Sequence, residues 1–189
     1  FCHGIALASD MVRSGSARHV LVIGVERLSD ITDIYDRGTA FIFADGAGAV
    51  VVGPSDVPGI SPVVWGSDGD QFDLIRQRED WRDVVGTPDQ PGSGLMPHLV
   101  MQGNPVFRWA VWQMSPVAQK ALDAAGITAA DLDSFIPHQA NVRIIDAMVK
   151  QLQMPEHVAV ARDIAHSGNT SAASIPLAMD RMLTEGEAH

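Results

Sequence analysis

One apolar segment near the start of the chain constrains the fold more than any other feature of the sequence. Residues 19–25 (His-Val-Leu-Val-Ile-Gly-Val) are almost all apolar and rich in β-branched side chains. Such a run predicts a strand buried on both faces, as in the middle of a parallel sheet. Residues 5–12 before it place apolar side chains at helical spacing, and Gly15 suits the end of that helix. The alternation of helical and strand periods predicts an α/β protein.

A hairpin and a linker are expected next along the chain. Residues 39–43 and 47–52 have strand-like composition and flank the turn dipeptide Asp45-Gly46. This arrangement predicts two strands joined by a tight hairpin. Residues 53–62 are dense in proline and glycine, which predicts a linker.

The second part of the chain is predicted to be mainly helical. After a surface loop over residues 87–97, Asn104 is the expected helix cap and Pro105 the first helical residue. Pro116 predicts a kink or a restart within that helix, because proline cannot donate the backbone hydrogen bond. Gly126 is expected to end it.

Two polar motifs follow short apolar runs in the last third of the chain. Residues 137–141 (Pro-His-Gln-Ala-Asn) lie between a predicted strand at 134–136 and a predicted helix at 142–152. Residues 166–173 read His-Ser-Gly-Asn-Thr-Ser-Ala-Ala. Because α/β folds bind ligands at the carboxyl edge of the sheet, the side chain of His138 can lie at a binding edge.

His138 and Asn169 both carry hydrogen-bond donors that need no charge. A neutral imidazole N–H and a carboxamide N–H that point at one oxygen would stabilise a developing enolate. Taken alone, a histidine at a strand end is more often an ordinary polar residue, and an asparagine after glycine often serves backbone geometry. The two motifs together, in this order, are far more specific.

Composition excludes several classes of protein. The 189 residues are 46% hydrophobic and carry a net charge of −10, which disfavours nucleic acid or anionic lipid as a bulk partner. No apolar run approaches the roughly 20 residues of a membrane span. The single cysteine excludes an internal disulfide and fits a cytoplasmic protein. Because the chain opens inside an apolar segment, we expect an internal fragment of a longer protein.

The motifs resemble those of the ketoacyl synthase III family, the enzymes that start fatty-acid synthesis. In that family the His and Asn pair stabilises the enolate formed when a malonyl thioester loses carbon dioxide. The similarity runs along the whole chain and is greatest to actinobacterial members. Further segments that carry it are residues 36–39, 43–49, 66–69 and 101–107.

The resemblance implies a thiolase-like fold, in which two similar halves stack in five layers, αβαβα. Residues 1–58 would be the end of the N-terminal half. Residues 59–189 would be the C-terminal half without its last strands. The family's nucleophile lies in a Cys-Ala-Gly-Phe segment whose Phe matches Phe1. The nucleophile is therefore expected three residues before Phe1, the fragment alone is expected to be inactive, and Cys2 is expected to be a small buried side chain.

The implied activity is a decarboxylative Claisen condensation of an acyl-CoA starter with malonyl-acyl carrier protein. His138 and Asn169 would be catalytic, and neither a metal nor a redox cofactor is implied. Two alternatives remain open at this point: a polyketide starter-unit condensing enzyme of the same fold, and a noncatalytic carrier-binding homologue. The motifs do not determine the starter acyl group.

The resemblance also assigns binding residues and partners. Arg37 would contact the nucleotide end of coenzyme A, and a homodimer is expected. The pantetheine channel would be lined by Gly103, Asn104 and Asn141. Because the whole chain is acidic, an acidic carrier protein would need a local basic patch. The residues expected to dock the carrier are Gln139, Ala140, Asn141, Val142, Arg143, Arg108 and Lys150.

Overall fold

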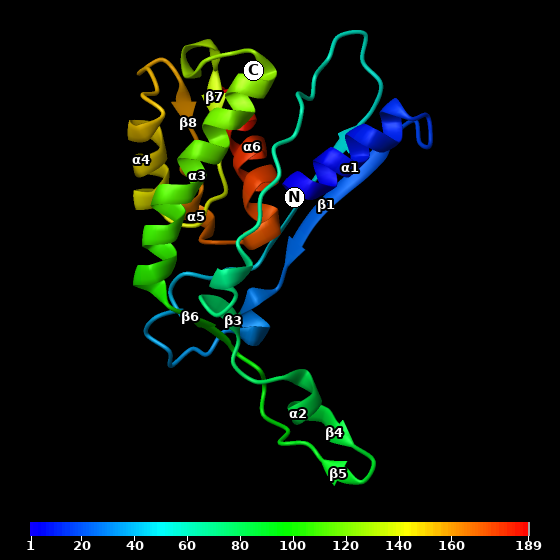
Figure 1. Ribbon diagram of the computed structural model, residues 1–189, viewed down its shortest axis with the longest axis vertical. Helices are drawn as coiled ribbons and strands as arrows, with labels where there is room; N and C mark the ends of the chain where they lie inside the picture. The colour runs from blue at the N-terminus through cyan, green and yellow to red at the C-terminus, as the bar shows by residue number, and fades with distance from the viewer. Residues whose placement is uncertain (189) are drawn as a thin grey trace.

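The computed structural model describes residues 1–188 and shows a chain of mixed helices and strands. Figure 1 shows a group of helices beside the first strand and, below them, an arm that projects from the rest. The helices are α1 (Cys2–Arg13), α2 (Trp81–Val85), α3 (Gly103–Ala125), α4 (Val142–Gln151), α5 (Ile164–Ser167) and α6 (Ser174–Glu185), with short 3-10 helices η1 (Leu28–Ile31), η2 (Gly69–Gln71), η3 (Ala129–Asp131) and η4 (Ser171–Ala173). The strands are β1 (Val20–Glu26), β2 (Gly46–Val52), β3 (Ile75–Gln77), β4 (Gly86–Thr87), β5 (Gln90–Pro91), β6 (Leu99–Met101), β7 (Ser134–Phe135) and β8 (Ala159–Val160).

The apolar run forms β1 as predicted, but its surroundings differ from the prediction. β1 pairs antiparallel with β2, and not with a parallel neighbour, within residues 1–188. Val22 is buried, whereas Leu21, Ile23 and Val25 are about 60% exposed. The two faces differ because α1, η4 and α6 all contact this pair of strands, and they cover the face that carries Val22.

The predicted hairpin at Asp45-Gly46 is wrong in one of its two strands. β2 forms where expected, but residues 39–42 lie in consecutive turns and Phe43 forms only a single β-bridge with Asn169. Asp36 starts these turns, because its carboxylate accepts hydrogen bonds from Gly38 N at 2.8 Å and Thr39 Oγ1 at 2.9 Å. This capping satisfies the local backbone donors, so β2 pairs with β1 instead.

The long helix α3 begins earlier than the sequence predicted and does not restart at its proline. Gln102, not Asn104, is the residue before its first turn, and Pro116 lies within one continuous helical segment. Gly126 ends it in a left-handed conformation, as predicted. α3 packs against α4, and this packing outweighs the single backbone bond that Pro116 removes.

A small parallel unit carries the first motif. β7 pairs with β8, and α6 packs its buried Ala178 and Met182 against Ala161, which follows β8. The predicted strand at 134–136 and helix at 142–152 are both present within a residue or two.

The arm in Figure 1 consists of α2, β4 and β5, so the loop predicted at residues 87–97 includes a short antiparallel pair. No helix within the described residues is long and apolar enough to cross a membrane.

Two glycines opposite each other in β1 and β2 allow the second motif to approach the sheet. Gly24 pairs with Gly48 in the register of the two strands. A Cβ atom on Gly24 would lie 2.2 Å from the carbonyl oxygen of Ala172, and one on Gly48 would lie 2.9 Å from Pro176. The backbone after Asn169 therefore rests directly on the sheet, where any side chain would displace it.

We predict that Gly24→Ala destabilises the full-length protein by about 1–3 kcal/mol, because the added methyl group overpacks this contact. Urea-induced unfolding measures the change. Gly59→Ala is the matched control, since no atom lies within 4 Å of a Cβ at that position. Equal unfolding midpoints for the two variants would show that the contact is not tight.

Candidate active site

His138 lies in the loop that joins β7 to α4, at the carboxyl end of the parallel pair. Asn141 caps α4 through its Oδ1, which accepts from Arg143 N at 2.9 Å. The loop is thus fixed at one end by the β7–β8 pair and at the other by a helix cap. This is the edge at which α/β folds place ligands.

Gln139 holds this loop from the inside and does not reach the surface. Its side chain is fully buried, and its Nε2 donates to the carbonyl of Pro137 at 2.8 Å. Its Oε1 accepts from Ile164 N at 3.2 Å, beyond the end of β8. The expectation that Gln139 contacts a carrier protein is therefore wrong: a buried amide whose hydrogen bonds are made internally serves the loop.

Asn169 is held so that its amide nitrogen is left as a donor. The residue is only 8% exposed, and its Oδ1 accepts from Ser171 N at 3.0 Å. Since a backbone N–H must meet an acceptor, this contact identifies the oxygen and leaves Nδ2 without a hydrogen-bond partner among residues 1–188. Ser171 has a φ of +47°, an uncommon value for a residue with a side chain that is often found at functional sites.

The backbone around Asn169 is tied to two earlier segments of the chain. Its N–H donates to Ile42 O, and its carbonyl accepts from Ala44 N, both at 3.0 Å. The carboxylate of Glu26, at the end of β1, accepts from Ala172 N at 3.2 Å. These contacts fix the Asn169 turn from both sides.

One hydrogen bond joins the two motifs. Nδ1 of His138 lies 2.7 Å from Oγ of Ser174, and Ser174 is the first residue of α6, directly after the Asn169 segment. Two loops that are more than 30 residues apart in the sequence therefore meet at one place. The loop of His138 thus contacts the start of α6, which directly follows the Asn169 turn. The convergence of the His138 and Asn169 side chains on one oxygen stays a prediction.

The environment of His138 favours its neutral form. Desolvation by the surrounding atoms lowers its pKa below the ordinary value of 6.5. By surface area His138 is nevertheless an exposed residue, so the crowding that lowers its pKa surrounds the ring on one side and leaves the other side open to solvent. A neutral imidazole with one accessible edge can donate a hydrogen bond to a ligand.

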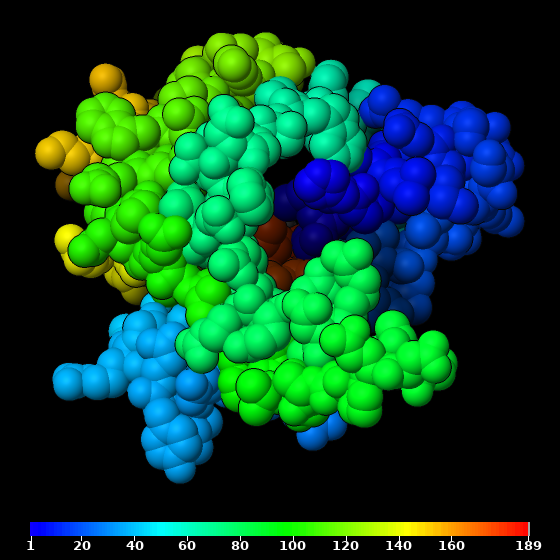
Figure 2. Space-filling model, turned by 60° about the horizontal axis from the view of Figure 1, so that its bottom comes forward, coloured from blue at the N-terminus to red at the C-terminus, as the bar shows by residue number. Residues whose placement is uncertain are grey.

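Figure 2 shows a hollow on one face of the molecule. The dark blue start of the chain, the blue-green segment after β2 and the green arm surround it, and orange-brown atoms from the C-terminal part lie inside.

Comparison with known proteins identifies the family of this chain. Residues 1–69 match the family model described as 3-oxoacyl-[acyl-carrier-protein (ACP)] synthase III, and residues 122–189 match the model of its C-terminal part. A beta-ketoacyl-[acyl-carrier-protein] synthase III of Streptomyces coelicolor is 61% identical over the whole of this chain, and one of Streptomyces glaucescens is 60% identical. The chain belongs to the 3-oxoacyl-[acyl-carrier-protein] synthase III family. It spans 57% and 55% of those two proteins.

Solved structures of synthase III relatives show the same fold. The priming beta-ketosynthase of the R1128 polyketide biosynthetic pathway superposes on the whole chain with a TM-score of 0.92 at 50% identity, over 55% of its own length. A synthase III of Thermus thermophilus superposes with a TM-score of 0.85 at 38% identity, over 57% of its length. The predicted α/β, thiolase-like fold is thus confirmed.

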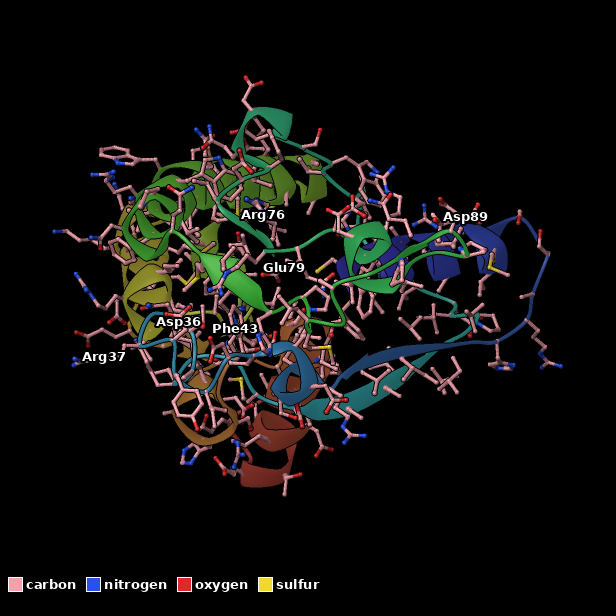
Figure 3. The ribbon with its side chains drawn as sticks, turned by 90° about the horizontal axis from the view of Figure 1, so that it is seen from below. Asp36, Arg37, Phe43, Arg76, Glu79 and Asp89 are labelled. Carbon is pink, nitrogen blue, oxygen red and sulfur yellow. The ribbon has the colours of Figure 1, made fainter. Side chains whose placement is uncertain are left out.

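The residues expected to bind coenzyme A and pantetheine lie on loops and helix starts. Arg37 is exposed, and Figure 3 shows it pointing outward beside Asp36. Gly103 and Asn104 are exposed in the first turn of α3. Asn141 is half-buried and its oxygen already caps α4, so only its Nδ2 remains for a ligand.

The basic residues expected to form a carrier-docking patch are all at the surface. Arg108, Arg143 and Lys150 are exposed, while Ala140 and Val142 are half-buried. The guanidinium of Arg143 lies 4.8 Å from the centre of the Phe107 ring on α3. This cation–π contact links α3 to α4 and holds Arg143 in a fixed place on the surface.

Cys2 does not take the position that the sequence suggested. It is exposed in the first turn of α1, not buried, because the covered side of this helix carries Ala6, Ala8 and Ser9. No hydrogen bond joins its sulfur to His138 within residues 1–188. The described residues also contain no group of three or more His, Cys, Asp or Glu side chains able to hold a metal ion.

Three residues have structural roles at the site that the sequence did not indicate: Glu26, Gln139 and Ser174. Ser174 stood at the end of a run of small residues and carried no separate signal. Glu26 is more than 140 positions from Ala172, which it contacts, so no local pattern could reveal it.

Proposed function

We propose that the full-length protein catalyses the decarboxylative condensation of an acyl-CoA starter with malonyl-acyl carrier protein. The observation that carries the proposal is the hydrogen bond between His138 and Ser174, which joins the histidine loop to the segment that follows Asn169. The lowered pKa of His138 favours its neutral form, and the amide nitrogen of Asn169 has no hydrogen-bond partner among the described residues. The names of the relatives, all beta-ketoacyl-[acyl-carrier-protein] synthase III, support the same activity.

In the proposed reaction the malonyl thioester loses its carboxylate as carbon dioxide. The electron pair of the broken carbon–carbon bond passes into an enolate, whose oxygen accepts from His138 Nε2–H and Asn169 Nδ2–H. The enolate carbon then attacks the acyl thioester, a new carbon–carbon bond forms, and a thiolate leaves. The negative charge of the carboxylate moves to the thioester oxygen only as the carbon–carbon bond breaks, so donors aimed at that oxygen stabilise the transition state more than the ground state.

The acyl group needs a nucleophile, and Cys2 does not suit that role. It is exposed and makes no hydrogen bond with His138 within residues 1–188. We propose a cysteine upstream of Phe1 as the nucleophile. Its replacement in the full-length sequence would favour a noncatalytic carrier-binding protein.

A polyketide starter-unit synthase is the second candidate. The priming ketosynthase of the R1128 pathway, with a TM-score of 0.92, is the observation that favours it. Both candidates use the same two donors and need no metal or redox cofactor. They differ in the acyl-CoA starter that the enzyme accepts. A competition assay with acetyl-, branched and longer acyl-CoA would identify the preferred starter. The product that is lost when the gene is deleted, a fatty acid or a polyketide, would then distinguish the two candidates.

We further propose that residues 1–58 end the N-terminal half of the thiolase-like fold and residues 59–189 begin the C-terminal half. A homodimer in the cytoplasm remains part of this proposal. The exposed apolar side chains of β1, Leu21, Ile23 and Val25, are compatible with a covered surface in the whole protein.

We predict that His138→Ala in the full-length protein slows malonyl decarboxylation by about 10²–10³, because one donor to the enolate oxygen is lost. Acyl transfer from acyl-CoA should remain largely intact, since it places charge on a different atom. Release of carbon dioxide and single-turnover acylation measure the two steps. His157→Ala is the control, because His157 is exposed and contacts only Ala130 O. Equal loss of both steps would contradict the assigned role.

We predict that Arg143→Glu raises KM for malonyl-acyl carrier protein about tenfold or more, because it reverses a charge in the basic patch that meets an acidic partner. The acylation rate with acyl-CoA should not change. Arg18→Glu makes the same charge change at the turn between α1 and β1 and serves as control. An equal rise in KM for both variants would point to net charge alone and would contradict a local docking patch.

A further inference from the structure

We infer that the hydroxyl of Ser174 fixes His138 in the neutral tautomer that carries its proton on Nε2, which makes Ser174 a positioning residue for the proposed condensation. This inference rests on the proposed function for its catalytic consequence, but the geometry stands alone. Ser174 is fully buried, and its Oγ lies 2.7 Å from Nδ1 of His138.

The location of the protons follows from the donors and acceptors around Ser174. The backbone N–H of Gln139 donates to Oγ at 3.3 Å, which uses one lone pair of the oxygen. Within residues 1–188, Nδ1 of His138 is the one acceptor that the hydroxyl proton meets. If Nδ1 carried the ring proton, a buried hydroxyl would be left without an acceptor, which folded proteins avoid.

Two features of the surroundings support this arrangement. Ser174 is the first residue of the twelve-residue helix α6, so the positive end of the helix dipole lies next to the ring and disfavours an imidazolium. Burial lowers the pKa of His138 in the same sense. A ring that is neutral and accepts at Nδ1 must hold its proton on Nε2.

The consequence concerns the donor to the enolate. With Ser174 present, Nε2–H is available in every molecule and the ring has one orientation. Without the hydroxyl, the proton distributes between the two nitrogens and the ring can rotate. Loss of a group that orients a ligating histidine typically lowers function about 10–100-fold, and a similar loss of decarboxylation is expected here.

The test uses the full-length protein with ¹⁵N-labelled histidine. Nitrogen chemical shifts should show His138 as a single Nε2–H tautomer in the parent and as a mixture in Ser174→Ala. Ser174→Thr keeps the hydroxyl and should restore the single tautomer. Ser115→Ala is the control, because Ser115 is a buried serine whose hydroxyl has no partner among the described residues. Decarboxylation should fall about 10–100-fold in Ser174→Ala only, with acyl transfer unchanged.

The outcomes separate the inference from the proposed function. An Nδ1–H tautomer in the parent protein, or an unchanged Nε2–H tautomer in Ser174→Ala, would overturn the inference. The parent measurement needs no variant, so a Ser174→Ala protein that fails to fold does not weaken the test. A parent protein with the predicted tautomer but no malonyl decarboxylation would overturn the proposed function and leave the positioning role of Ser174 intact.

Discussion

The close contact between the β1–β2 sheet and the segment after Asn169 is the constraint on which the site depends. Two glycines, Gly24 and Gly48, face each other across the strands and leave room for the backbone of Ala172 and for Pro176. Once this segment rests on the sheet, α6 begins at a fixed place and presents its first residue to the histidine loop. The β1–β2 sheet contributes no proposed catalytic residue, but it fixes the segment that follows Asn169 and the start of α6. A tightly packed backbone contact leaves that segment almost no freedom to move.

The electrostatic character of the site follows from the same packing. Burial and the start of α6 disfavour a positive charge on His138. The turn at Asn169 uses its amide oxygen internally and leaves the amide nitrogen without a hydrogen-bond partner among residues 1–188. In the proposed reaction, both side chains are held in place before any ligand arrives and act as uncharged donors toward an oxygen that gains charge. A charged group would attract the malonyl carboxylate itself, so neutrality favours the transition state over the substrate.

Local patterns predicted the parts of this structure that are decided locally. The helix at the start of the chain, the apolar strand β1 and the strand–loop–helix around His138 all follow from periodicity and caps. The sequence-based predictions were wrong where contacts between distant segments of the chain determine the local structure. The segment 39–43 looked like a strand, yet it is held by the Asp36 turn and by pairing with Asn169. Gln139 looked like a surface residue beside the basic patch, but its hydrogen bonds to Ile164 place it inside. Ser174 gave no signal because only folding brings it to the histidine.

The central claim is that His138 and Asn169 donate to one common oxygen, and a double-mutant cycle tests it most directly. Malonyl decarboxylation would be measured for the full-length parent, for each Ala variant, and for the double Ala variant. Groups that act as a unit lose most of their effect when either one is removed, so the double variant should be little slower than the slower single variant. If the rate reduction in the double variant equals the product of the two single reductions, the two positions are not coupled. That result would show that the side chains act independently and would contradict the account.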